Sequence, residues 1–499
     1  MTKKKWFLLT FVLFAIHFVA VLAWVSDGFT HFNYTLDDPY IHLQLARNIW
    51  HGHYGFNSAE LSAPSSSVLW PLVLAPFSSF GFYELVPLVL NIILSLCFAG
   101  YLFKILEKRG WSERATFLVT LLGLLVINCV GLALTGLEHV LQILVVLVIV
   151  DKILMRFPDE KVGDQNDVSV AGILALALLI RYEMLVFWVA IVGFYILSRQ
   201  FRKAVLVGSL SLLPLVMFSL FLSFLKLGFL PASVMAKTKS HEVFPLSLLG
   251  NVWANVVSRP GMMLILLTLV AVALCVKSKK ANITNLWIII TPAVLHILVG
   301  RFGWFYRYEV YIYLYLSLLI LMLIDFKKMK SSWVAVWTVF FVIVYWPYLG
   351  SVGKLRQACR NIYYQQGVTV DFLNKYLPEA IGTNDIGYVG FKHPFYVLDL
   401  YGLASKEALD YRLHAPNFDW VTNLAKEHNV EVIFVYLKWI NPNSDWVKVA
   451  EFETTERSVV LGYPILWVYA KPTRVAGLRK DLIEFQKTIQ RDPIKLRIY

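Results

Sequence analysis

Long apolar runs, each ended by a short cluster of charged residues, follow one another along most of the chain. A run of about 20 apolar residues is long enough to cross a bilayer as a helix. The pattern predicts about eleven crossings on this length criterion. The expected spans cover residues 6–25, 83–106, 115–134, a fourth run that ends before Lys152, both halves of 168–197, and then 204–225, 262–276, 286–299, 310–324 and 333–348.

The basic residues between these runs predict how the chain is oriented in the membrane. Lys3, Lys4 and Lys5 precede the first run, and an excess of Lys and Arg in cytoplasmic loops predicts a cytoplasmic N-terminus. The first run is too long for an ordinary signal-peptide core, which favours a retained anchor, with cleavage after Ala23 as the alternative. Neither alternative changes the arrangement of the remaining chain.

The run over residues 168–197 has two interpretations. Arg181-Tyr182-Glu183 divides it into halves, and either two short helices form a hairpin or one long helix passes through the triplet. The hairpin leaves the later basic clusters inside, and the positive-inside rule therefore favours it.

From residue 351 onwards the composition is that of a water-exposed domain. A helical pattern over 355–376 precedes β-rich runs at 396–399, 430–436, 446–450 and 465–469, with helical segments at 406–412 and 418–428 between them. Strands that alternate with helices predict an α/β domain. The division is therefore a transmembrane domain over 1–350 and an external domain over 351–499. The basic tail 471–499 is expected to be a solvated helix packed on this domain.

The first external loop, residues 26–82, contains the most distinctive polar stretch. Asp37 and Asp38 precede Pro39, and apolar residues then recur at helical spacing until Gly52. Asp38 is expected to cap this helix, with Pro39 at its first position. The helix is expected to lie on the membrane surface, and a second interfacial helix is expected at 68–80. One alternative is that the two acids only cap the helix.

Composition agrees with a polytopic membrane protein and argues against nucleic-acid binding. The hydrophobic fraction is 58%, the charged fraction is 16%, and mean hydropathy is +0.62. The formal charge of +13 comes from short basic clusters between apolar runs, which is typical of cytoplasmic loops. The four cysteines have neither metal nor redox spacing, and no disulfide framework is expected.

Charged residues at the ends of the expected spans fall on the external side. Such residues either pair with one another or serve a site, because a charge at membrane depth is costly. Arg181 with Glu183 or Glu138 could form a structural ion pair. Alternatively, a carboxylate could take a hydroxyl proton while Arg and Lys stabilise a departing phosphate. The residues concerned are Asp37, Asp38, Glu138, Arg181, Glu183, Lys237, Arg301 and Arg307.

The chain resembles the GT-C superfamily of integral-membrane glycosyltransferases, most closely bacterial members that are similar to arabinofuranosyl- or mannosyltransferases. The likeness is strongest in the first loop and covers most of the chain. The matching residues are Asp37-Asp38-Pro39-Tyr40-Ile41, Ala46-Arg47-Asn48, Gly52, Asn57, Glu60, Ser67-Val68-Leu69-Trp70, Thr135-Gly136-Leu137-Glu138, Arg181-Tyr182-Glu183, Leu230-Pro231, Lys237, Arg307-Tyr308, Asn384-Asp385-Ile386-Gly387 and Asp399-Leu400-Tyr401-Gly402-Leu403.

The resemblance implies an inverting transfer of a sugar from a polyprenyl-phosphate donor to a hydroxyl of a glycan, lipid or protein of the cell envelope. It implies that Asp37 is the general base and that Asp38 supports it or helps to hold a divalent cation, which some relatives use. It further implies a multi-pass protein of the cell (inner) membrane. Residues expected to contact the lipid phosphate or substrate are Arg47, Glu138, Arg181, Glu183, Lys237, Arg301 and Arg307.

Two other functions compete with sugar transfer. A transporter or flippase of a lipid-linked sugar predicts related halves and helices broken at the midplane, whereas no halves repeat in this chain. A non-catalytic assembly or receptor protein built around the external domain would leave the acid pair unexplained.

Overall fold

The computed structural model describes residues 3–28, 32–154, 166–236, 246–324, 331–489 and 493–499. The chain forms two compact units. The helical unit consists of Met1–Val21, Leu88–Phe218 and Val243–Gly353, and the sheet unit consists of Leu22–Pro87, Ser219–Glu242 and Lys354–Tyr499. The units change at Gly353 and Lys354, and the sheet unit also includes most of the first loop. The assignment of 1–350 to the membrane and of 351–499 to the external side stays a prediction.

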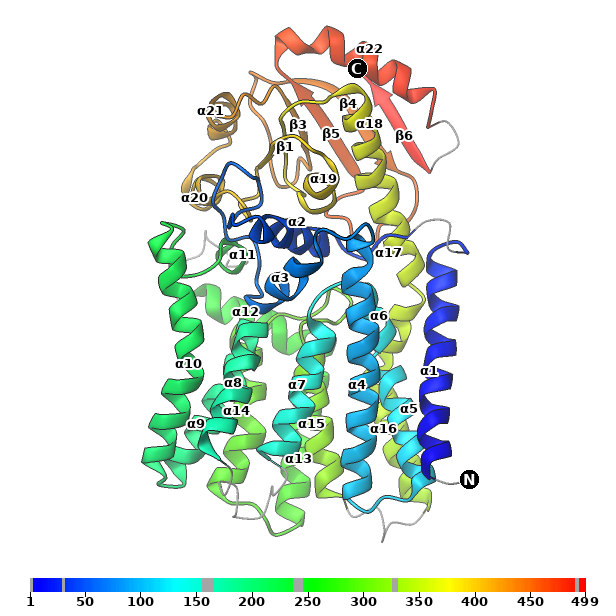
Figure 1. Cartoon of the computed structure of the whole chain (residues 1–499), viewed down its shortest axis with the longest axis vertical. Coiled ribbons are helices and arrows are strands. Elements are labelled where there is room, and N and C mark those ends of the chain that lie inside the picture. The colour runs from blue at the N-terminus through cyan, green and yellow to red at the C-terminus, as the bar shows by residue number, and fades with distance from the viewer. Residues whose placement is uncertain (1–2, 29–31, 155–165, 237–245, 325–330, 490–492) are drawn as a thin grey trace. The chain divides into compact units, whose positions relative to one another are not determined.

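Apolar helices build the helical unit (Figure 1). Among the described residues, five helices are long and apolar enough to cross a membrane, namely α1, the run through η2 and α4, α10, α13 and α16. These fit a polytopic helical membrane protein, and the count of about eleven crossings stays a prediction. The helices are α1 (Lys3–Val25), α4 (Val86–Lys108), α5 (Glu113–Val126), α6 (Cys129–Leu134), α7 (His139–Lys152), α8 (Asp167–Ile180), η3 (Tyr182–Met184), α9 (Leu185–Leu197), α10 (Phe201–Phe224), α12 (Leu246–Val257), α13 (Arg259–Lys277), α14 (Ile283–Val299), α15 (Val310–Leu323) and α16 (Ser331–Val352).

The structure shows helix breaks within two of the apolar runs, 168–197 and 115–134. The stretch 168–197 does break at Arg181, where α8 ends and the short η3 turn begins, as the divided pattern predicts. The run over 115–134 is not one continuous helix, because Asn128 adopts a left-handed conformation with φ of 50° between α5 and α6; its crossing of the membrane stays a prediction. The Asn128 side chain accepts a hydrogen bond from the Gly131 amide at 3.0 Å and so starts the separate helix α6.

A mixed six-stranded sheet forms the centre of the sheet unit (Figure 1). The strand order is β2-β1-β3-β5-β4-β6, in which β2, β1 and β3 run parallel and the other neighbours pair antiparallel. The strands are β1 (Ile381–Thr383), β2 (Val397–Asp399), β3 (Val432–Val435), β4 (Val447–Thr454), β5 (Ile465–Ala470) and β6 (Ile494–Ile498).

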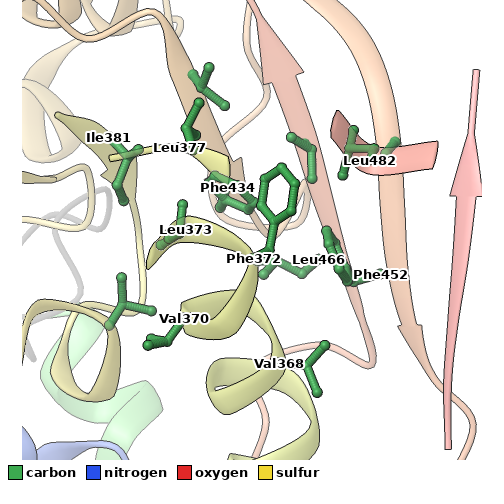
Figure 2. Packing of buried hydrophobic residues seen from close by; sticks show 14 of the residues in the cluster. Val368, Val370, Phe372, Leu373, Leu377, Ile381, Phe434, Phe452, Leu466 and Leu482 are labelled. Carbon is green, nitrogen blue, oxygen red and sulfur yellow. The ribbon is translucent and has the colours of Figure 1, made fainter. Parts of the chain in front are cut away.

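Helices cover both faces of this sheet, because successive strand residues point to opposite faces. On one face, Phe434 packs with Phe372 of α18 and Leu482 of α22, as Figure 2 shows. On the other face, Val435 packs with Leu424 of α21. The helices and turns of the sheet unit are α2 (Asp38–Trp50), α3 (Leu69–Leu74), η1 (Ala75–Phe77), η2 (Tyr83–Leu85), α11 (Ala232–Met235), α17 (Leu355–Ile362), η5 (Tyr363–Gly367), α18 (Val368–Tyr376), α19 (Gly387–Lys392), α20 (Lys406–His414), α21 (Trp420–Glu427), η6 (Pro472–Arg474) and α22 (Val475–Gln486).

The C-terminal tail corrects the expectation of a helix over 471–499. The described residues of the tail form the short η6 turn and α22, and β6 then pairs with β4 at the edge of the sheet. Ile494 and Leu496 are buried, whereas Lys495 and Arg497 alternate with them on the exposed side. Such a period of two is the pattern of a half-buried strand. The Arg497 guanidinium also pairs with Glu451 across the strands at 2.8 Å.

Candidate active site

The first acid of the pair is fixed by the main chain of α19. Asp37 is 9% exposed, and its two carboxylate oxygens accept hydrogen bonds from the amides of Gly387 at 2.6 Å and Tyr388 at 2.7 Å. The helix α2 begins at Asp38 rather than Pro39, and Asp37 makes no side-chain capping bond to it. Asp37 therefore holds the loop to α19 instead of capping its own helix, and the expected cap at Asp38 is wrong by one position.

Glycine is required at residue 387 for this close approach. A Cβ atom built there would lie 2.2 Å from the Asp37 main-chain oxygen and 2.5 Å from Asp37 Oδ2, well inside contact distance. Gly390, one turn further along α19, faces the first loop in the same way, because a Cβ atom there would lie 2.3 Å from the Phe56 ring. The backbone of α19 at Gly387 and Gly390 thus packs directly against Asp37 and Phe56 of the first loop.

A third acid, Asp385, stands beside the pair. Its carboxyl group is within hydrogen-bonding reach of that of Asp37, and Asp38 also acts on it electrostatically. Burial and the neighbouring Asp385 raise the pKa of Asp37 well above its ordinary value. Burial likewise raises the pKa of Asp385, and Asp38 adds to that shift. Two buried carboxyl groups this close favour one shared proton. Asp38, by contrast, is half-buried.

Asp385 is itself held from two sides. Gln366 Nε2 donates to Asp385 Oδ2 at 2.9 Å, and the Tyr436 hydroxyl lies 3.2 Å from the same oxygen. Gln366 belongs to η5, a five-residue π-helical turn between α17 and α18, and such turns are frequent at functional sites. A small cavity of about 10 Å³ lies next to Asp385 and is also lined by Gln366, Thr369, Thr383 and Tyr436.

Further residues of the first loop bind it to the C-terminal part of the chain. Asn57 exchanges two hydrogen bonds with the main chain of Val397 in β2, at 3.0 and 3.1 Å. Glu60 accepts a hydrogen bond from the Tyr396 hydroxyl at 2.8 Å. These two side chains join the loop to β2 and the residue before it, and the loop belongs to the sheet unit.

Arg47 contacts Phe391 of α19. Its guanidinium lies 4.5 Å from the Phe391 ring centroid and donates to the Phe391 main-chain oxygen at 3.4 Å. Burial lowers its pKa from the ordinary value. Arg47 therefore joins α2 to α19, and its role as a phosphate ligand stays a prediction.

Four of the expected site residues lie in the helical unit, where Arg181 binds Glu138 and Glu183, and where Arg181 and Arg307 both lie near the Tyr308 ring. The Arg181 guanidinium donates to both oxygens of Glu183, at 2.8 and 3.0 Å, and to Glu138 Oε1. Arg307 lies 4.9 Å from the Tyr308 ring centroid, and Arg181 lies 5.8 Å from it. The structural ion pair that the sequence left as an alternative is thus formed, and Arg181 is engaged by two carboxylates.

Two expected residues stand outside these groups. Arg301 is exposed, and Lys237 lies outside the described residues. In the part of the chain that the structure describes, no group of three or more His, Cys, Asp or Glu side chains is arranged to hold a metal ion. A divalent cation near Asp38 stays a prediction. Asp37 and Asp38 belong to the sheet unit, whereas Glu138, Arg181, Glu183, Arg301 and Arg307 belong to the helical unit.

Sequence reasoning assigned no role to Asp385, Gln366 or Tyr436. The motif Asn384-Asp385-Ile386-Gly387 gave a signal, but nothing in its pattern points to the first loop, since 350 residues separate Asp37 from Gly387. Gln366 and Tyr436 carry no local signal, because each acquires its contact with Asp385 only through the tertiary fold.

Known proteins resemble the chain in part. A family described as "Domain of unknown function (DUF8728)" matches residues 360–469. No curated protein matches the chain. The chain is similar to the crystal structure of the Archaeoglobus fulgidus oligosaccharyltransferase in complex with Zn and sulfate, with 11% identity and a TM-score of 0.46 over 87% of this chain and 69% of that one. A likeness of this strength defines no activity.

Proposed function

We propose that the protein is a membrane glycosyltransferase that moves a sugar from a polyprenyl-phosphate donor to a hydroxyl group of a cell-envelope glycan, lipid or protein on the external face. The observation that carries this proposal is the acid pair itself. Asp37 is buried and held by two amides, so that the half-buried carboxylate of Asp38 is presented at a fixed position. A positioned carboxylate beside a rigid main chain suits general-base catalysis.

We assign the base to Asp38 and the supporting role to Asp37, which exchanges the two roles that the resemblance implies. A base must be ionised, and burial together with Asp385 favours the protonated form of Asp37. Asp38 is the more accessible of the two carboxylates. The neighbouring amides of Gly387 and Tyr388 fix Asp37, and with it the start of α2.

The proposed reaction is a single displacement. The acceptor oxygen forms a bond to the anomeric carbon while the bond from that carbon to the phosphate oxygen breaks. Asp38 takes the acceptor's hydroxyl proton, and the polyprenyl phosphate leaves with the bonding electron pair. One displacement inverts the anomeric configuration. Cationic side chains would stabilise the charge that develops on the departing phosphate.

The experiment compares the full-length parent with a variant that carries Asp37→Asn and Asp38→Asn together, both in lipid nanodiscs. The probes are ¹⁴C-labelled polyprenyl-phosphate mannose and arabinofuranose, with envelope glycans and lipids from a strain that lacks the protein as acceptors. We expect label to move from donor to acceptor only with the parent. Equal transfer by the double variant would exclude the acid pair from catalysis. If the parent is instead reconstituted in closed vesicles, label that crosses the vesicle membrane without a change in its lipid linkage would indicate a flippase.

A further inference from the structure

Asp385 is a buried acid for which the proposed displacement has no use. It lies in the turn between β1 and α19, and its carboxyl group faces that of Asp37 from the first loop. Each of its contacts comes from a different element: Gln366 from η5, Tyr436 from the end of β3, and Asp37 from the residue before α2. Because Asp385 contacts three separate elements, its side chain can fix the position of the first loop.

We propose that Asp385 is a positioning residue of the acid pair: its carboxyl group hydrogen-bonds to that of Asp37 and so fixes Asp38 toward the acceptor. The proposal rests on the proposed function for the role of Asp38, whereas the coupling of Asp37 to Asp385 can be measured without it. In this arrangement Asp385 touches neither substrate nor the reacting atoms. It acts through Asp37, and the transferred proton does not pass through it.

The surroundings of Asp385 hold its carboxyl group at a fixed position beside that of Asp37. Gln366 is 3% exposed and donates through Nε2, while its Oε1 has no hydrogen-bond partner among the described residues. That oxygen belongs to a residue lining the cavity of about 10 Å³, which is the size that one water molecule requires. The Tyr436 main-chain amide, in turn, donates to Asn384 Oδ1 at 2.7 Å. Asn384 and Asp385 of this turn therefore both contact Tyr436, the residue that follows β3.

A conservative substitution separates positioning from catalysis. In Asp385→Asn the side-chain amide can donate to Asp37 while its oxygen still accepts from Gln366, so the geometry survives without the carboxyl group. In Asp385→Ala both contacts are lost. Asp410→Ala is the matched control, because Asp410 is an exposed acid on α20.

The first measurement is kcat and donor KM for transfer from labelled polyprenyl-phosphate mannose or arabinofuranose, with full-length protein in nanodiscs. We expect Asp385→Ala to lower kcat about 100-fold, because a displacement of about 1 Å costs that much, with donor KM little changed. Asp385→Asn should stay within about tenfold of the parent on the same scale. Equal losses in Asp385→Asn and Asp385→Ala would overturn the positioning role, as would full activity of Asp385→Ala.

The second measurement is independent of transfer. Thermal unfolding midpoints are compared for Asp37→Ala, Asp385→Ala and the double variant. If the two carboxyl groups are coupled, the double variant's shift is smaller than the sum of the single shifts by about 2 °C or more. Additive shifts would overturn the contact between Asp37 and Asp385. Coupling without transfer by the parent on either donor would keep the contact and reject the proposed function.

Discussion

The amide of Gly387 donates a hydrogen bond of 2.6 Å to the carboxylate of Asp37, from which 350 residues separate it. A Cβ atom at residue 387 would lie 2.2 Å from the Asp37 main-chain oxygen. The loop that carries the acid pair and the segment 384–392 therefore form one structure. A catalytic role for the loop then depends on the C-terminal part of the chain as much as on the apolar helices.

Gly387→Ala should destabilise the protein and lower transfer. The new methyl group must push Asp37 away from α19, and overpacking of this kind costs about 1–3 kcal/mol. The unfolding midpoint in detergent and the transfer rate are the measurements. Gly477→Ala on α22 is the control, because the nearest heavy atom to its Cβ would be Arg474 Nη1 at 3.8 Å. A Gly387→Ala protein as stable and active as the control would show that the close contact does not exist.

Arg181→Ala should unfold the helical unit at a lower temperature. Arg181 is 3% exposed and binds Glu138 and Glu183, so its removal takes away a buried cation that both carboxylates contact. Removal of one partner of a buried ion pair costs about 3–5 kcal/mol. Size-exclusion profiles after heating measure the effect, with the exposed Arg114→Ala as the control. If Arg181→Ala and Arg114→Ala unfold at the same temperature, the ion pairs of Arg181 with Glu138 and Glu183 are not buried.

Asp399 should make stability depend on pH. Burial raises its pKa to about 6, although the amides of Tyr401, Gly402 and Ala404 donate to its carboxylate. The folded protein then binds a proton between about pH 4 and pH 6 that the unfolded chain has lost, so the contribution of Asp399 to stability falls as pH rises through this window and is constant above it.

The measurement for Asp399 is the unfolding midpoint of the parent relative to Asp399→Asn at a series of pH values. We expect this difference to fall from pH 4 to pH 6 and then to level off. Parallel curves across the whole range would mean that Asp399 titrates in the same way in the folded and unfolded states.

Patterns that repeat along the chain predicted most of the helices and four of the strands. The break at Arg181, the turn at Gly52 and the alternation of strands with helices after residue 351 are local signals, and the structure contains all three features. Local patterns failed where one residue alters the backbone. Asn128 lies between two apolar segments, and the spacing of apolar residues does not reveal its left-handed conformation.

The site was predicted only in part, because its contacts join distant segments. The motif around Asp37 indicated an acid pair, and the triplet at Arg181 indicated paired charges. Neither motif could show that Asp37 is held by the amides of α19 or that Asp385 faces it. These contacts depend on which distant segments the tertiary fold brings together. The spacing of hydrophobic residues carries no information about such long-range contacts. The alternation at Ile494 and Leu496, in contrast, was a readable strand signal within a tail expected to be helical.

The most direct test of the account is the rate constant for a single turnover of labelled polyprenyl-phosphate sugar by Asp38→Asn protein in nanodiscs. The substitution keeps the size of the side chain and removes its ability to take a proton. The account predicts a rate constant lower by about 10²–10⁴-fold, with donor affinity and the unfolding midpoint close to those of the parent. Transfer by Asp38→Asn at the parent's rate would contradict it.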